Sequence, residues 1–361
     1  MLAESYIHSL SPFAIQITDT IGLRWYGLAY LFGFLVAWIL LRRFSEKGIT
    51  PLTKEQAGDF VLSSVLGVVI GGRLGYVLFY NPELLITLEK SFPWWEVLAI
   101  HKGGMSSHGG IVGVFGTMFY WSKKHNVRLP RLMDVGPYIA IPGLCFGRIA
   151  NFINGELWGR RLPEGLQQES PWWSIKYPTE ITEVWSQFPD TYQHKLNALL
   201  ELQKTVLGDS RFYHNIVQEA YNGNQVVVNK ITPLLTAWYP SQLFQAATNG
   251  LILFIALTIV WWKPQKEGVI AGWFLVLYGL FRILTEAYRQ PDEGIALIIG
   301  LTRGQLLSVL LVVAGATLIL FFSNRQTKRV GGIKNLFKQQ PQQDSLNKAV
   351  SSEQLKTQSK P

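Results

Sequence analysis

The sequence predicts an all-α polytopic membrane protein with about seven transmembrane helices and a small extracytoplasmic head. Composition is the first observation: 16% of the 361 residues are charged, compared with about 25% in a soluble domain, and 48% are hydrophobic. The second is that the apolar residues gather in runs close to the twenty or so needed to cross a bilayer. The third is a single long polar stretch, 155–240, between two groups of such runs, and this stretch predicts the head.

The apolar runs predict seven spans in chain order. They lie at about 22–41, 58–80, 105–121, 135–153, 241–262, 268–288 and 304–322. The third run is short and begins among glycines, so a broken or re-entrant segment is an alternative to a short continuous helix. Residues 1–20 contain no Lys or Arg and no long apolar core, so we expect the first span to act as the insertion signal.

These runs divide the chain into four parts. Residues 1–154 form the first part of the bundle with four spans, and 155–240 form the head insertion. Residues 241–323 complete the bundle with three spans. The tail 324–361 is basic and rich in Gln, Ser and Lys, so we expect it to be disordered in the cytoplasm.

The formal net charge of +9 is concentrated in segments that seven spans would place on one side of the membrane. These basic segments are 42–54, 122–133, 263–267 and the tail. The positive-inside rule then predicts a cytoplasmic C-terminus and an N-terminus outside. Such a distribution indicates topology and attraction to anionic lipid, and it argues against nucleic acid as a partner.

Polar residues at the end of the fourth span predict the functional site. A charged side chain at the bilayer centre costs about 2.5–3.5 kcal/mol on insertion scales, so it usually faces an interior cavity. On a helix Arg148 and Asn151 share one face, and Glu156 follows them. The planar guanidinium of Arg148 suits a phosphate or a carboxylate, whereas Glu156 either neutralises Arg148 or serves as a base.

A second polar stripe lies on the sixth span. Tyr278, Arg282, Glu286 and Arg289 follow one another at helical spacing and leave a net positive face. An ion-pair network that braces the bundle is one interpretation. We favour a functional one, because Arg148 supplies a third cation at a similar depth.

Three further residues are candidates with open alternatives. Tyr26 opens the first span, where tyrosine is often only an interfacial anchor. Arg73 is a cation in the second span that needs a partner, either a structural ion pair or an anionic headgroup. His108 follows a Gly-rich stretch, and it is either a satisfied hydrogen-bonding residue or a group that transfers protons near neutral pH.

The chain shows no metal-ligand pattern, P-loop or nucleophile elbow, so we expect no metal and no cofactor. Arginines in a pocket open to lipid fit an anionic phospholipid headgroup. Because no protein nucleophile is evident, the attacking group is expected to come from a second substrate.

Several motifs, in order along the chain, resemble the bacterial prolipoprotein diacylglyceryl transferase family. The main one is Gly-Arg-Ile-Ala-Asn-Phe-Ile-Asn-Gly-Glu-Leu-Trp-Gly at 147–159. The others are Trp-Tyr-Gly-Leu at 25–28, Gly-Gly-Arg-Leu-Gly-Tyr-Val-Leu-Phe-Tyr-Asn at 71–81, Met-Ser-Ser-His-Gly-Gly at 105–110, Pro-Ser-Gln-Leu at 240–243, and Phe281-Arg282 through Glu286 to 289–292. The resemblance runs from about residue 13 to residue 322.

The resemblance implies a function. Family members transfer the diacylglyceryl group of phosphatidylglycerol to the lipobox cysteine thiol of preprolipoproteins in the bacterial inner membrane, and glycerol 1-phosphate leaves. The family fold has seven spans, a periplasmic head, the N-terminus outside and the C-terminus inside. The partners that it implies are phosphatidylglycerol, lipobox segments and membrane lipid.

The resemblance also implies roles for individual residues. Arg148 and Arg282 match the binders of the headgroup phosphate, and His108 matches the candidate for thiol activation. Three further residues match positions that the family needs for activity: Tyr26, Asn151 and Gly159. Two carboxylates, Glu156 and Glu286, match residues that orient the arginines. This chain departs from the family at Tyr239 and Gln245, where members often carry a histidine and an acid.

Two other functions fit the same arginines. A transporter of an anionic solute would use them as a binding site, although we see no convincing two-fold repeat of the kind transporters show. A non-catalytic lipid-binding scaffold is the other alternative, and it would tolerate the loss of His108 or Arg282.

Overall fold

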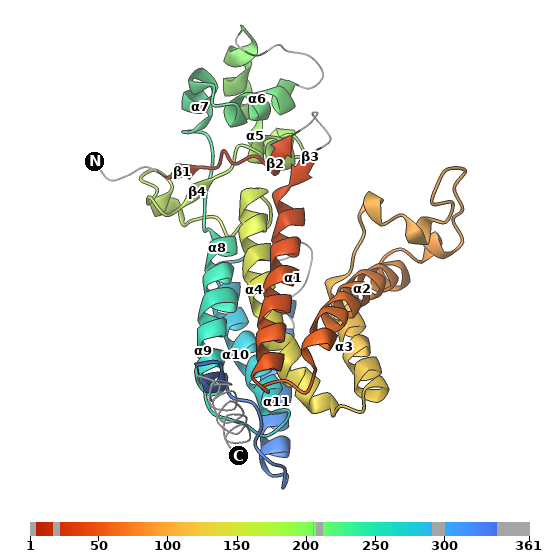
Figure 1. The fold of residues 1–361 in the computed structure, drawn as a ribbon. Helices are drawn as coiled ribbons and strands as arrows, with labels where there is room; N and C mark the ends of the chain where they lie inside the picture. The colour runs from red at the N-terminus through yellow and green to blue at the C-terminus, as the bar shows by residue number, and fades with distance from the viewer. Residues whose placement is uncertain (1–4, 17–21, 205, 207–211, 291–299, 338–361) are drawn as a thin grey trace, which may run out of the picture.

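The computed structural model describes residues 5–16, 22–204, 206, 212–290 and 300–337. Its long helices form one bundle with a separate small unit at one end, which we call the head end; the opposite end is the tail end (Figure 1). The bundle contains α1 (Trp25–Glu46), α4 (Leu129–Ile153), α10 (Val269–Glu286) and α11 (Arg303–Ser323). A further continuous helical run joins α8 (Ser241–Gln245), the π-helix η7 (Ala246–Ile252) and α9 (Leu253–Val260).

Two more helices form a hairpin that leans away from this bundle towards the head end (Figure 1). They are α2 (Lys54–Phe79) and α3 (Ser107–Lys124). Glycines let their backbones touch: a Cβ at Gly71 would lie 2.8 Å from Cα of Gly113, and one at Gly75 would lie 2.8 Å from Cα of Gly109. Small residues at intervals of four thus serve close packing inside this chain.

The helices agree with a polytopic membrane protein. Within the described residues, five helical segments are long and apolar enough to cross a bilayer: α1, α2, residues 241–260, α10 and α11. The other two predicted spans coincide with α3 and α4, which have 18 and 25 residues but are less apolar. The alternative of a broken third span is wrong, because α3 is one continuous helix capped by Ser106, whose Oγ accepts the Gly109 N–H at 3.2 Å.

The bundle has its main hydrophobic core towards the tail end. Leu41 and Phe44 of α1 are fully buried there against Tyr138 of α4 and Trp261. Part of the tail that we expected to be disordered folds back onto this core: Ile333 of η8 (Ile333–Phe337) is 3% exposed. The remaining residues of that tail, 338–361, lie outside the described residues.

The head is built from residues 155–240 together with the first strand of the chain. One sheet has the order β1 (Tyr6–Ile7), β4 (Ile175–Lys176) and β5 (Ala237–Trp238), and a hairpin of β2 (Phe13–Gln16) and β3 (Gly22–Arg24) leads into α1. Around the buried Trp185 pack the π-helix η5 (Ile181–Trp185) and α5 (Pro189–Leu199), α6 (Phe212–Tyr221) and α7 (Gln225–Ile231). The described chain is therefore mostly helical, with two small sheets that the all-α prediction did not include.

Short 3₁₀ segments occupy the connections. They are η1 (Pro82–Leu85), η2 (Glu96–Leu98), η3 (Ile100–Lys102), η4 (Glu164–Leu166) and η6 (Leu200–Lys204). The first three lie in the loop between α2 and α3, which projects beside the head in Figure 1.

Candidate active site at the head end of the bundle

The head ends of α1, α4 and α10 bring the predicted polar residues together. Arg148 near the end of α4 interacts electrostatically with Tyr278, Arg282 and Arg289 of the α10 segment and with Tyr26 of α1. These residues come from three separate parts of the chain. The two arginine-bearing stripes that the sequence predicted therefore face a common region beneath the head.

Arg148 is held by an amide and not directly by a carboxylate. Its Nη1 donates to Asn151 Oδ1 at 3.4 Å, and Asn151 Nδ2 in turn donates to Glu156 Oε1 at 2.8 Å. Asn151 is 5% exposed. Arg148 has five N–H groups, and among the described residues only one of them is used in a hydrogen bond, so the others can bind an anion.

Arg282 is held more tightly. Its Nη2 lies 3.0 Å from Glu286 Oε2, and the two side chains are 15% and 4% exposed. Thr302, the N-cap of α11, donates to Glu286 Oε1 at 3.1 Å, and Gln245 Oε1 accepts from Arg282 Nη1 at 3.2 Å. Glu286 and Gln245 together fix the plane of the Arg282 guanidinium.

Gly159 lies where the segment after α4 passes the end of α10. It forms an antiparallel bridge with Arg289, and Arg160 N and Nε donate to the carbonyl oxygens of Tyr288 and Arg289, each at 2.9 Å. A Cβ at Gly159 would lie 2.8 Å from Tyr288 O and closer still to Tyr239 O. Only glycine allows this close approach, which ties the stretch carrying Glu156 to the stretch carrying Arg289.

Tyr26 begins α1 beside this region. Its ring packs edge-on against that of Tyr30 one turn later, with ring centroids 5.2 Å apart, and Tyr30 interacts electrostatically with Arg148 and Glu156. Tyr26 therefore lies next to the polar cluster that contains Arg148.

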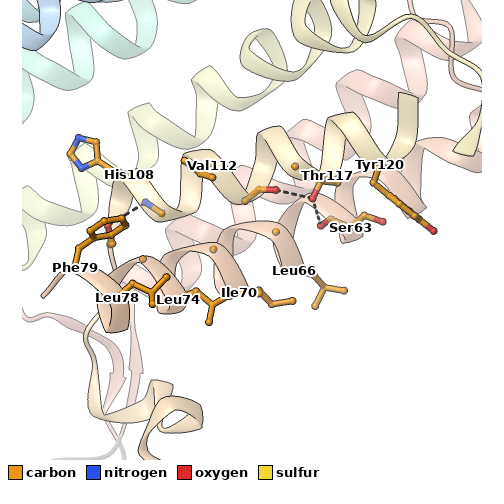
Figure 2. Close-up of a pocket in the computed structure, with 17 residues that line it drawn as sticks. Ser63, Leu66, Ile70, Leu74, Leu78, Phe79, His108, Val112, Thr117 and Tyr120 are labelled. Carbon is orange, nitrogen blue, oxygen red and sulfur yellow. Dashed lines mark hydrogen bonds between the residues drawn. The ribbon is translucent and has the colours of Figure 1, made fainter. Parts of the chain in front are cut away.

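His108 lies elsewhere, at the first turn of α3. It lines an apolar groove of about 640 Å³ between α2 and α3, together with residues such as Leu74, Val112 and Thr117 (Figure 2). In Figure 2 the imidazole is at one end of the groove and projects on the opposite side of α3 from Leu74 and Leu78. Within the described part of the chain, His108 makes no hydrogen bond or ion pair with the arginines of α4 and α10.

Arg73 is also set apart from the cluster. Its guanidinium donates to four backbone carbonyls of the α2–α3 loop, those of Glu96, Val97, Gly103 and Gly104, at 2.6–3.0 Å. The side chain is 5% exposed. Its hydrogen-bond partners are carbonyls and not the carboxylate of an ion pair, and through them Arg73 holds the loop that precedes α3.

Three residues that sequence reasoning did not select contribute to this region. Gln245 had been seen only as a departure from the family, yet it contacts Arg282 directly. Gln242 Nε2 donates to Glu156 O at 2.7 Å. His8 is fully buried, and its Nε2 donates to Phe152 O at 2.8 Å, so its Nδ1 is the acceptor for the Tyr221 hydroxyl at 3.3 Å.

The cluster in turn affects the electrostatics of the head. Burial raises the pKa of Glu183 in the head, and the negative charge of Glu156 raises this pKa further. Burial raises the pKa of Tyr221 to about 12 and lowers the pKa of His8, which therefore stays neutral near pH 7. The head is in this way packed and electrostatically coupled to the end of α4.

These features define a polytopic membrane protein with a partly buried, arginine-rich polar cluster beneath a small head. The chain belongs to the prolipoprotein diacylglyceryl transferase family, whose model matches residues 12–321. It is 36% identical over 346 residues to the phosphatidylglycerol–prolipoprotein diacylglyceryl transferase of Bdellovibrio bacteriovorus, covering 90% of this chain and 96% of that relative. The protein of the same name from Xylella fastidiosa is 34% identical to this chain, over 88% of this chain and 93% of that relative. The one from Neisseria gonorrhoeae is 36% identical, over 85% of this chain and 94% of that relative.

Proposed function

We propose that this protein is a membrane transferase that moves the diacylglyceryl group of phosphatidylglycerol to the lipobox cysteine thiol of preprolipoproteins. The observation that carries the proposal is the convergence of Arg148 and Arg282, from α4 and α10, on one region of the bundle. Relatives at 33–36% identity along nearly their whole length are named for this activity, which does not favour the transporter alternative.

The reaction is an alkyl transfer. The thiol sulfur forms a bond to the glyceryl carbon, the bond between that carbon and the phosphate oxygen breaks, and glycerol 1-phosphate leaves with the electron pair. The thiol proton passes to a base. Because negative charge gathers on the departing phosphate, fixed guanidinium groups stabilise the transition state more than the substrate.

The contacts suggest different parts for the two arginines. Arg148 supplies most of the available N–H donors to the phosphate, since one weak bond to Asn151 is its hydrogen bond among the described residues. Arg282 supplies a charge in a fixed plane, because Glu286 and Gln245 hold it. Tyr26, Asn151, Gly159 and Arg289 shape the site, and Glu156 orients Asn151.

His108 is our candidate for the base that accepts the thiol proton. A thiol becomes a good nucleophile only as a thiolate. The exposed imidazole has no competing partner among the described residues, and it lies at the head end of the α2–α3 groove. In this proposal the lipobox cysteine reaches the arginines from the side of the hairpin.

We further propose that all seven long helical segments cross the membrane, with the head outside and the C-terminus in the cytoplasm. The support is the placement of basic residues. Basic residues gather at the tail end: Arg42 and Arg43 near the end of α1, Lys123 and Lys124 in the last turn of α3, and Lys263 and Lys266 between α9 and α10. This orientation places the arginine site below the outer surface.

A mass measurement tests the proposed activity. Purified protein in phosphatidylglycerol liposomes is incubated with a lipobox peptide, and we expect the peptide mass to rise by one diacylglyceryl unit. The variants Arg148→Ala and Arg282→Ala should each slow transfer at least about 100-fold, because each removes a preorganised charge. Arg161→Ala is the control, since the side chain of Arg161 is 54% exposed and its one ion pair among the described residues is with Glu164 at the surface of the head. A wild-type protein that leaves the peptide mass unchanged would refute the activity, and full activity in both arginine variants would refute the site.

A further inference from the structure

The buried carboxylate of Asp134 joins α4 to the first turn of α10 at the tail end of the bundle. Its Oδ2 accepts the N–H of Gly268 at 2.8 Å, and its Oδ1 accepts the N–H of Ala271 at 2.9 Å. Asp134 itself is 6% exposed. The first N–H groups of a helix have no partner within the helix, and an N-cap side chain normally supplies one.

α10 cannot cap itself. Its N-cap residue is Gly268, which has a φ of 90° and no side chain. A Cβ there would also meet the ring of Phe322. The cap is therefore supplied by the neighbouring helix, and two hydrogen bonds from one carboxylate fix how far α10 is shifted along α4.

Both helices run from this contact towards the arginine site. Arg148 lies fourteen residues after Asp134, and Arg282 lies fourteen residues after Gly268. At a rise of about 1.5 Å per residue, each arginine is about 21 Å along its helix from the shared contact. Equal lengths of helix therefore bring the two guanidinium groups to the same depth.

α4 needs such an anchor because it is weakened along this length. Pro137 and Pro142 lie inside the helix between Asp134 and Arg148. Each proline removes one backbone hydrogen bond and bends the helix. A second link at the same junction joins Glu267 to Arg128 at 2.9 Å and to Arg131 at 3.8 Å, but this link is between side chains, and among the described residues it caps no N–H group of α10.

We infer that Asp134 is a positioning residue: it sets the axial register of α10 on α4 and so places Arg148 and Arg282 to engage one phosphate together. This inference rests on the proposed function, because it assigns the two arginines to the same ligand. It assigns Asp134 no contact with substrate.

A double-mutant cycle separates positioning from simple stabilisation. Asp134→Leu removes both acceptors, and Asp134→Asn keeps one. We expect them to slow transfer about 100-fold and about 10-fold, because a misplacement of about 1 Å in a clamp can cost two orders of magnitude. Arg282→Ala should cost at least 100-fold in the wild-type background but less than threefold in the Asp134→Leu background, since the register that made Arg282 useful is already lost.

Independent losses that multiply in the double variant would overturn the inference. If Arg282→Ala does not slow transfer even in the wild-type background, the proposed site itself fails. This outcome differs from a failure of the Asp134 inference alone, in which Arg282→Ala slows transfer equally in both backgrounds. Glu267→Gln is the matched control at the same junction, with an expected change of less than threefold. If Glu267→Gln lost as much transfer activity as Asp134→Asn, then charge at the junction would matter and the helix cap would not. This result would also overturn the inference.

A distance measurement gives a readout that does not depend on activity. With Cys145, the only cysteine, replaced by Ser, spin labels are placed at the exposed Leu144 of α4 and Leu284 of α10. We expect one narrow distance distribution in the parent and a shifted or broadened one with Asp134→Asn, which is the variant to use if Asp134→Leu does not fold. An unchanged distribution in the Asp134 variant would refute a role in register.

Discussion

Replacing Gly159 with alanine is the sharpest test of how the site is assembled. The added Cβ would lie 2.8 Å from Tyr288 O and 2.9 Å from the carbonyl carbon of Tyr239, and its closest contact would be with Tyr239 O. All three are backbone atoms, so no side chain can rotate to make room. The segment 158–160 must therefore move away from the end of α10.

The size of the effect follows from what that movement breaks. Arg160 makes two hydrogen bonds to carbonyl oxygens of Tyr288 and Arg289, each at 2.9 Å. At about 1 kcal/mol for each bond, their loss lowers the free energy of unfolding by about 2 kcal/mol. The effect on catalysis is larger, because a shift of about 1 Å between the elements that carry Glu156 and Arg289 can cost about 100-fold in rate.

The assay compares transfer to a lipobox peptide and thermal unfolding for Gly159→Ala and for a control, Gly165→Ala. A Cβ at Gly165 meets no atom within 4 Å, so this variant should match the wild type in both measurements. The reasoning is refuted if Gly159→Ala retains activity within threefold of the wild type and unfolds at the same temperature.

Three further variants test other parts of the site. Burial lowers the pKa of His8 from 6.5, so between the folded and unfolded pKa values the unfolded chain binds more protons than the folded one. The stability that neutral His8 contributes is present above pH 6.5 and is lost as the pH falls. Thermal unfolding between pH 5 and 8 should show this slope in the wild type and in the control His194→Gln, but not in His8→Gln. If His108 accepts the thiol proton, His108→Gln should slow transfer to the lipobox peptide by about 100-fold, and a variant that retains the wild-type rate would exclude this role. In the liposome assay, Arg282→Lys should lose at least tenfold more activity than Arg148→Lys. The reason is that a lysine ammonium lacks the planar fork with which Arg282 contacts Glu286, Gln245 and a phosphate together. Equal losses would contradict the different parts assigned to the two arginines.

The sequence was sufficient to locate the long helices but not their ends. Hydropathy placed the fourth span at 135–153, whereas α4 begins at Leu129, because the polar residues Arg131 and Asp134 are helical but not apolar. In α2 the helix begins at Lys54 and not near residue 58, since Thr53 and Gln56 form a capping box ahead of the apolar run. That capping box is a readable signal, and it would have corrected the boundary.

Side-chain partners were less predictable. From the sequence, Arg73 could not be distinguished from a ligand-binding cation. Its partners are backbone carbonyls, and because every residue has a carbonyl, the residue types do not indicate which ones it contacts. Gln245 immediately precedes the π-helix η7, where the helical period changes, so spacing alone does not show that it faces Arg282. His8 directly follows the short strand β1 and is far along the chain from Phe152, so the residues around it do not predict that contact.

The two arginines of the site are similar in sequence context but differ in electrostatic balance. Arg282 faces a carboxylate at 3.0 Å, so its charge is largely compensated before any ligand binds, whereas Arg148 reaches a carboxylate only through the amide of Asn151. Gln245 keeps the α10 stripe of Arg282, Glu286 and Arg289 net positive, because an acid at that position would place a second negative charge beside Arg282. In the proposed reaction the site binds an anionic lipid and releases an anionic product. We expect the tightly held Arg282 guanidinium to orient the phosphate, and the N–H groups of Arg148 that are not bonded to Asn151 to stabilise the charge that develops as the carbon–oxygen bond breaks.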